Sequence, residues 1–148
     1  MSGILQAKAA ALFHDEQGTV HKDWTGKVAV AVTDPGFRAA YRHLSRRPQG
    51  VCERAVVPDP EDLPEYARTR TPLFSLESQR PLTDFDLVLF AVPSEHDCPN
   101  VLQVLAIAGI PPLAAERTGA HPLLAMGGVL TSGNPEPLAR AYEGAGLA

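Results

Sequence analysis

The sequence predicts an α/β domain with a mainly parallel sheet of about four to five strands. Three continuous apolar runs of strand length occur at 27–35, 84–93 and 121–128. Such runs are typical of strands that are buried on both faces of a sheet. Strands that alternate with helical patterns indicate parallel pairing through right-handed crossovers. The 148 residues are enough for one domain of this kind with its own core.

The first predicted unit is a strand, a tight turn and a helix. The strand KVAVAVTDP (27–35) ends at Asp34 and Pro35, which suit the N-cap and the first position of a helix. Asp34 is therefore interpreted as a cap rather than as a catalytic carboxylate. Pro48 and Gly50 end this helix. One face of it carries apolar residues at helical spacing: Phe37, Ala40, Tyr41 and Leu44.

The alternation continues along the rest of the chain. In order, the further predicted elements are a strand at 51–60, a short helix at 60–70 that proline interrupts, an edge strand at 72–78, a strand at 84–93, a helix from 98 to 109, a strand at 121–128 and a helix that opens near 134. Cys98 is the predicted N-cap of the helix at 98–109, with Pro99 at its first position and Gly109 at its end. Residues 1–27 are predicted to form an N-terminal helix or arm.

Charge and composition exclude several classes of protein. The formal net charge of −4 argues against a nucleic-acid-binding surface. No apolar run approaches the roughly 20 residues that a membrane span needs, and the N-terminus has no evident signal-peptide cleavage site. Two cysteines do not make a disulfide framework, so we expect a protein of the reducing cytoplasm.

Candidate ligand-binding residues lie where the predicted strands end. In open parallel sheets ligands bind beyond the carboxyl ends of the strands, near the point where the strand order reverses. The loops at 33–36, 92–99 and 127–134 are therefore the candidates. The middle loop carries five functional side chains in succession: Ser94, Glu95, His96, Asp97 and Cys98.

Three interpretations of this middle loop stay open. A metal site is the weakest, because His96 and Cys98 are two positions apart and no second pair with zinc spacing exists. Cys98 could be a nucleophile with a lowered thiol pKa at a helix N-terminus and His96 as its base, although no third orienting group is identifiable. The favoured interpretation is a turn in which Cys98 caps the helix while His96 and Asp97 face solvent.

The segment MGGVLTSGN (126–134) is glycine-rich but matches neither the dinucleotide fingerprint nor the P-loop. Gly127 and Gly128 permit the backbone to approach either a ligand or a neighbouring loop closely. The arginines at 42, 46 and 47 are interpreted as the solvated end of a helix rather than as a basic patch.

Several separated motifs in a fixed order carry a family resemblance. They are HKDW before the first strand, then YRHLSRRP, PLFSLESQRPLTDFDLVLF, NVLQVLAIAGIPPLAAER, HPLLAMGG and NPEPLA. From about residue 19 onward, the chain resembles the N-terminal region of a subfamily of radical SAM proteins that carry a cobalamin-binding-like domain ahead of their catalytic barrel. The resemblance implies a Rossmann-like, flavodoxin-type domain of three layers over residues 28–148, in the cytoplasm, beside an iron–sulfur barrel.

The resemblance also implies a ligand site. Ser94 and Glu95 match the loop after the third core strand, and Gly127 and Gly128 match the paired glycines before the last helix. In cobalamin domains both regions lie near the nucleotide tail of the cofactor. Cobalamin is thus the candidate cofactor, and these four residues are its candidate contacts. The His-Asp-Cys part of the same loop matches no functional residue of the family.

Three departures from the family pattern narrow what the resemblance implies. The cluster motif C-x-x-x-C-x-x-C is absent, since Cys52 and Cys98 are the only cysteines, so we expect no iron–sulfur cluster in this chain. The loop TDPGFRAAY (33–41) is shorter than in the family and lacks an Asp-x-His-x-x-Gly motif, so a corrinoid has to bind without histidine ligation. Ala148 falls where the family's last strand would begin, which predicts a shortened domain or an open sheet edge that a partner chain completes.

We therefore expect a non-catalytic domain of the ligand-binding type, related to the cobalamin-binding domain of radical SAM proteins. The alternative is a cofactor-free interaction module that pairs through its exposed sheet edge, with itself as a homodimer or with a separate radical SAM barrel. A third hypothesis is a small hydrolase or transferase that uses Cys98 and His96. Nucleic acid, a membrane and a metal ion are not expected as partners.

Overall fold

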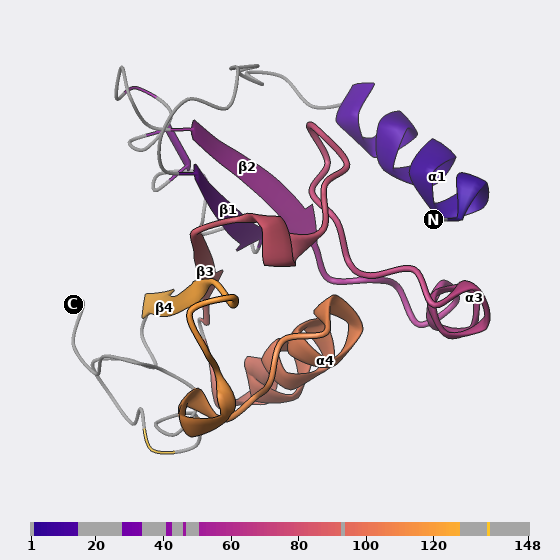
Figure 1. Ribbon diagram of the computed structural model, residues 1–148. Helices are drawn as coiled ribbons and strands as arrows, with labels where there is room; N and C mark the ends of the chain where they lie inside the picture. Colours follow the sequence, from indigo (N-terminus) through magenta and orange to yellow (C-terminus); the bar gives the residue numbers. More distant parts are fainter. Residues whose placement is uncertain are drawn as a thin grey trace.

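The computed structural model describes residues 2–14, 28–33, 41–42, 46, 51–92, 94–127 and 136. In this part of the chain four parallel strands form one sheet: β1 (Val28–Thr33), β2 (Val51–Val56), β3 (Leu87–Ala91) and β4 (Leu123–Gly127). Their order across the sheet is β2-β1-β3-β4 (Figure 1). The predicted α/β class with a parallel sheet is therefore confirmed.

The helices of the described residues are short. They are α1 (Gly3–His14), α3 (Leu63–Thr69) and α4 (Cys98–Ala108), with 3₁₀ turns at Leu82–Asp84 (η2), Glu95–Asp97 (η3) and Ala114–Glu116 (η4). As predicted, α4 ends at Gly109, whose φ of 72° is a left-handed conformation that favours glycine.

The predicted N-cap of α4 is wrong by one residue. The structure places Asp97 at the N-cap and Cys98 inside the helix as its first residue. The reason is that η3 runs directly into α4, so the backbone is already helical at Asp97, with φ −88° and ψ −9°. Asp97 makes no side-chain capping hydrogen bond within α4.

The main core lies between α4 and one face of the sheet (Figure 1). Alternate residues of a strand point to the same face, and Val88 and Phe90 of β3 and Leu124 of β4 are buried in this core. From α4 the buried residues at helical spacing are Val101, Val104, Leu105 and Ala108. Each fully buried Val or Leu side chain contributes roughly 1.5–3 kcal/mol relative to an exposed one, which fixes the position of the loop between β3 and α4.

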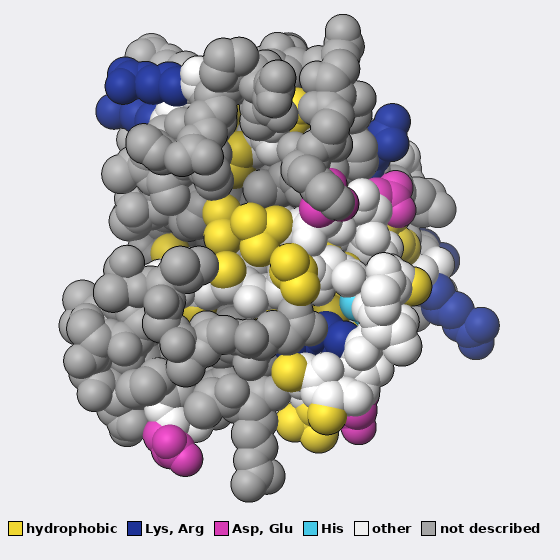
Figure 2. All heavy atoms as spheres, turned by 60° about the vertical axis from the view of Figure 1, so that its left-hand side comes forward, with side chains coloured by type: hydrophobic (Ala, Val, Ile, Leu, Met, Phe, Trp, Pro, Cys, Tyr) yellow, Lys and Arg dark blue, Asp and Glu magenta, His cyan; other side chains and the backbone are white. Residues whose placement is uncertain are grey.

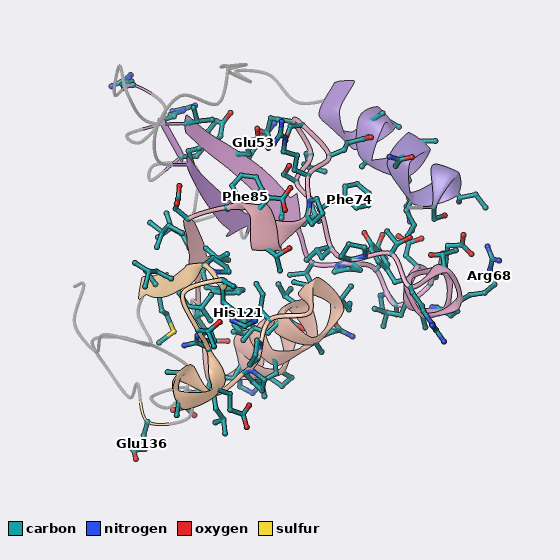
Figure 3. All side chains as sticks on the ribbon, in the orientation of Figure 1. Glu53, Arg68, Phe74, Phe85, His121 and Glu136 are labelled. Carbon is teal, nitrogen blue, oxygen red and sulfur yellow. The ribbon has the colours of Figure 1, made fainter. Side chains whose placement is uncertain are left out.

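A second, smaller cluster attaches α1 to the rest of the chain. Leu5 and Ala9 pack against Phe74 and Leu76, and Phe74 lies in the segment that faces α1 (Figure 3). The Ser2 N–H donates a 2.8 Å hydrogen bond to Thr71 Oγ1, 69 residues away, and the Ser2 hydroxyl donates one of 2.6 Å to Glu65 Oε1. The start of the chain is thus joined to α3 and to the loop after it.

The predicted edge strand at 72–78 is wrong. This segment forms a loop that makes one isolated antiparallel bridge, between Phe74 and Pro81. Leu76 to Ser78 form a turn, because Ser75 N–H bonds back to the Arg80 carbonyl at 2.9 Å and the chain cannot continue extended.

Several predictions fall outside the described residues. These are the cap at Asp34, the helix after β1 apart from Tyr41, Arg42 and Arg46, and the last helix apart from Glu136. Among the residues that are described, no helix is both long enough and apolar enough to cross a membrane.

Candidate functional site

The carboxyl ends of β3 and β4 lie side by side. In the register of the two strands Ala91 is opposite Gly127, and the Val92 N–H donates a 2.9 Å hydrogen bond to the Gly127 carbonyl. The loop that carries Ser94 and Glu95 therefore starts next to Gly127. The structure brings three of the four predicted site residues to the same edge of the sheet, and the fourth, Gly128, is not among the described residues.

Ser94 is held by a compact turn at the start of α4. Its backbone is extended, with φ −147° and ψ 163°, and η3 follows at once. The Ser94 hydroxyl donates a 3.0 Å hydrogen bond to Asp97 Oδ2, and the Asp97 N–H returns a 3.1 Å bond to the Ser94 carbonyl. Glu95 and His96 are exposed beside this turn. The arrangement offers a positioned hydroxyl and an accessible carboxylate, but no nucleophile with its base.

The backbone at Gly127 borders open space. A Cβ atom built on Gly127 would meet no other heavy atom within 4 Å. Packing against a neighbouring loop therefore does not require glycine at this position.

Cys98 does not have the properties of a nucleophile. Its residue is 9% exposed, and burial raises the pKa of its thiol, with further increases from the Glu95 and Asp97 carboxylates. The raised pKa argues against a thiol activated by the helix N-terminus, because burial and the two nearby carboxylates disfavour the thiolate. In the described part of the chain, no three His, Cys, Asp or Glu side chains are grouped so that they could hold a metal ion.

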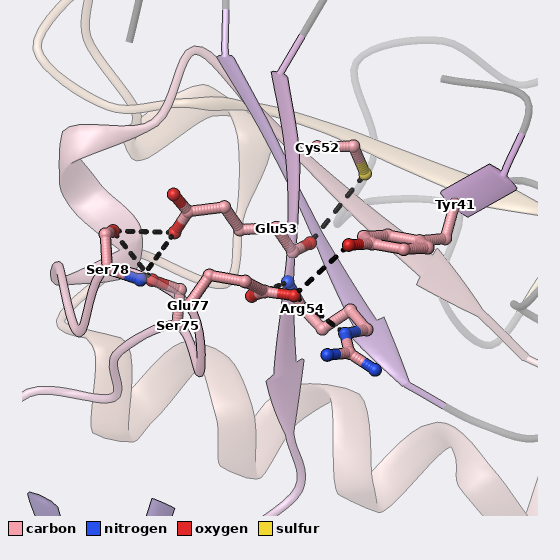
Figure 4. Close-up of polar contacts among 7 residues, drawn as sticks. All are labelled: Tyr41, Cys52, Glu53, Arg54, Ser75, Glu77 and Ser78. Carbon is pink, nitrogen blue, oxygen red and sulfur yellow. Dashed lines mark hydrogen bonds and ion pairs between the residues drawn. The ribbon is translucent and has the colours of Figure 1, made fainter. Parts of the chain in front are cut away.

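A cluster of buried polar side chains, which the sequence analysis did not predict, lies on β2. Glu53 is 4% exposed and Arg54 is 6% exposed. Arg54 Nε donates a 2.7 Å hydrogen bond to Glu77 Oε1, and the Arg54 backbone N–H donates another of 2.7 Å to Glu77 Oε2 (Figure 4). The Arg54 guanidinium also lies 5.1 Å from the centre of the Tyr41 ring, a cation–π distance.

The other charged residue of β2 binds the same loop. The Ser78 hydroxyl donates a 2.6 Å hydrogen bond to Glu53 Oε2, and the hydroxyls of Ser75 and Ser78 are 3.2 Å apart (Figure 4). Burial raises the pKa of the Glu77 carboxyl, and the hydrogen bonds and charge of Arg54 oppose that rise.

Cys52 lies in the same environment. Burial raises the pKa of the Cys52 thiol to about 12, and the carboxylates of Glu77 and Glu53 add to the increase. Both cysteines of the chain are buried free thiols. A signal for this cluster was present in the sequence: VCERAV (51–56) places two opposite charges inside an otherwise apolar strand, and buried charges need partners.

Comparison with known families identifies the chain. A family model described as radical SAM proteins, N-terminal, matches residues 36–144. The chain belongs to this family. The match includes β2, β3, α4 and β4 and thus both the strand-end site and the polar cluster, whereas α1 and β1 precede it. No curated protein and no solved structure matches the chain. This match confirms the predicted resemblance to the N-terminal region of radical SAM proteins, while the cobalamin-binding character that the resemblance implied stays a prediction.

Proposed function

We propose that this radical SAM N-terminal domain is a non-catalytic, Rossmann-like domain of the flavodoxin type, which holds a ligand at the carboxyl edge of its sheet. The observation that carries the proposal is the strand order β2-β1-β3-β4 together with the adjacency of Ala91 and Gly127. In the flavodoxin-type order the direction in which strands are added to the sheet switches between β1 and β3, and ligands bind beyond the carboxyl ends of the strands near that point. The loop with Ser94 and Glu95 follows the third strand.

A corrinoid is the ligand that the family resemblance suggests. The Ser94 turn and the open space beside Gly127 fit the tail of such a ligand. No histidine stands in the loop TDPGFRAAY (33–41), so this chain would hold the corrinoid through its tail and its faces rather than through the cobalt. A corrinoid bound there would supply a cobalt centre that carries a carbon group. The chain's own residues would only bind and orient it.

The test of this proposal is retention of a coloured corrinoid. The protein is mixed with hydroxocobalamin and desalted, and its visible spectrum is recorded. We expect the wild type to retain the cofactor and Gly127→Val to lose it, because the valine side chain fills the open space at the strand end.

Gly119→Val is the matched control, since a Cβ at Gly119 also meets no atom within 4 Å and this glycine precedes β4. It should retain the cofactor as well as the wild type does. A wild type that retains no colour, or a Gly127→Val variant that retains as much as the wild type, contradicts the proposal.

A second candidate function is pairing through the edge of β4. Among the described strands, β4 is hydrogen-bonded to β3 alone and stands at the end of the sheet. Its Leu123 side chain is 60% exposed, and hydrophobic side chains reach the surface on the side of the molecule where β4 lies (Figure 2). Exposed apolar edge strands favour pairing with another chain, here a second copy or a separate radical SAM barrel.

Size-exclusion chromatography with light scattering tests this second function. We expect a dimer that Leu123→Lys dissociates, because a lysine at a strand edge opposes pairing. Leu113→Lys is the control, since Leu113 is 43% exposed but lies outside the sheet. A wild type that stays monomeric at all concentrations, and that also fails to bind a separately expressed barrel, contradicts it.

A further inference from the structure

The outer edge of β2 is already occupied by a loop of the same chain. The backbone of Arg54 makes two hydrogen bonds on this edge: its carbonyl accepts one of 2.7 Å from the Leu76 N–H, and its N–H donates one of 2.7 Å to Glu77 Oε2. A neighbouring strand would offer one donor and one acceptor to the same two groups. Leu76 supplies the donor from its backbone, and Glu77 supplies the acceptor from its side chain.

The loop holds β2 from both faces of the sheet. Successive side chains of a strand point to opposite faces, so Glu53 and Arg54 lie on opposite sides of β2. Ser78 binds Glu53 through its hydroxyl, and Glu77 binds Arg54 through its carboxylate (Figure 4). The loop therefore lies astride the strand edge rather than beside one face of it.

The base of the loop is fixed by backbone contacts. The Leu82 N–H donates a 3.0 Å hydrogen bond to the Leu73 carbonyl, and Phe74 pairs with Pro81 in the antiparallel bridge. Gln79 has a φ of 54°, a left-handed conformation that is unfavourable for a residue with a side chain. Its side-chain Nε2 donates a 3.0 Å hydrogen bond to the Gln6 carbonyl of α1, which helps to hold this conformation.

We propose that Ser75 to Arg80 form a guard loop whose role is to keep β2 closed to strand addition. The occupant that the guard loop excludes is the β2 strand of a second copy of this chain. Exposed strand edges present unpaired N–H and C=O groups that template pairing with another chain. The buried Glu77–Arg54 ion pair keeps the guard loop in place, because lifting the loop would separate two buried opposite charges that lie 2.7 Å apart.

The test compares two variants that should both lose stability. Glu77→Ala removes the acceptor of the Arg54 N–H and the partner of its side chain. Leu82→Ala removes a fully buried side chain next to the loop but leaves every polar contact of the guard loop intact. Light scattering over a range of concentrations measures the self-association constant of each variant. The wild type, measured in the same way, gives the reference oligomeric state.

We expect the self-association constant of Glu77→Ala to be at least tenfold higher than that of the wild type. The constant of Leu82→Ala should equal that of the wild type. Hydrogen exchange in dilute solution should show the Arg54 amide exchanging at least tenfold faster in Glu77→Ala and unchanged in Leu82→Ala. If the two variants associate equally, lost stability rather than the opened strand edge explains their association, and the proposal is overturned.

A milder variant covers the case in which Glu77→Ala does not fold. Glu77→Gln keeps an oxygen acceptor but removes the charge that pairs with Arg54. Faster exchange of the Arg54 amide and stronger association in Glu77→Gln support the guard loop. Wild-type exchange together with wild-type association in the folded variant overturns it.

Discussion

The carboxylate of Glu77 accepts two hydrogen bonds of 2.7 Å from a single residue, Arg54, one from Nε and one from the backbone N–H. Both side chains are almost fully buried, at 3% and 8% exposure. The pair joins β2 to a loop 23 residues further along the chain. One carboxylate thus satisfies both a buried charge and an edge amide.

Removal of the Glu77 carboxylate should destabilise the protein strongly. Glu77→Ala removes a buried carboxylate that bonds both the side chain and the backbone N–H of Arg54, and we expect the free energy of unfolding to fall by about 3–5 kcal/mol. Urea denaturation at low protein concentration measures it. Arg68→Ala is the control, because the Arg68 side chain is 69% exposed in its pair with Glu65, and solvent screens such pairs. Equal losses of unfolding free energy in the two variants would show that the buried Glu77–Arg54 pair stabilises the fold no more than an exposed pair does.

Stability should fall at alkaline pH because of Cys52. The pKa of its thiol is raised from 9.0 to about 12 in the folded protein. The stability that this shift provides is therefore complete below pH 9 and is lost as the pH rises through 12. At pH 10, one unit above the unfolded pKa, the loss should be on the order of 1 kcal/mol. Comparison of denaturation at pH 8 and pH 10 in wild type and Cys52→Ser measures it. The variant should lose less stability between the two pH values, and equal losses would show that Cys52 ionises normally.

Cys98 should react slowly with alkylating reagents. The thiolate is the reactive form, and burial raises the pKa of Cys98 while only 9% of the residue is exposed. We expect iodoacetamide to label Cys98 in the native protein at least tenfold more slowly than in urea-unfolded protein at pH 7.5, as followed by mass spectrometry. Fast labelling of the native protein would restore the hypothesis of an activated cysteine.

The N-terminal helix should contribute to the stability of the whole fold. Leu5 is 3% exposed and packs against Phe74 and Leu76, so Leu5→Ala should cost about 2–3 kcal/mol. Ile4 is 68% exposed on the same helix, and Ile4→Ala should change stability by less than about 0.5 kcal/mol. Thermal denaturation of the two variants distinguishes a docked helix from one that contributes nothing. Similar melting temperatures for both would contradict the packing of α1.

Much of the sheet could be predicted because its strands are continuous apolar runs. The runs at 84–93 and 121–128 contain β3 and β4, and Gly109 marked the end of α4. That the Ser94 loop and Gly127 lie at one edge of the sheet also followed from the sequence, since parallel strands end at one edge, whereas the pairing of β3 with β4 did not.

The guard loop could not be predicted, because its partners are distant in sequence. The pattern PLFSLES (72–78) alternates like an edge strand, but Glu77 bonds to β2 through its carboxylate rather than through a backbone ladder. A period-2 pattern does not distinguish these two modes of contact. The pairing of Glu77 with Arg54 depends on the path of the chain between residues 54 and 77, which local patterns do not determine.

If the guard loop closes β2 as proposed, it would also limit how many copies of this domain can assemble. Of the two outer strands of the described sheet, β2 is bonded at Arg54 by the guard loop, and no backbone hydrogen bond between described residues occupies the outer edge of β4. Two copies that pair through β4 about a two-fold axis would use up both uncovered edges and leave a guard loop at each outer end. Growth would stop there, because no free strand remains to recruit a third copy. If both proposals hold, the guard loop would favour a finite pair of copies over a fibre.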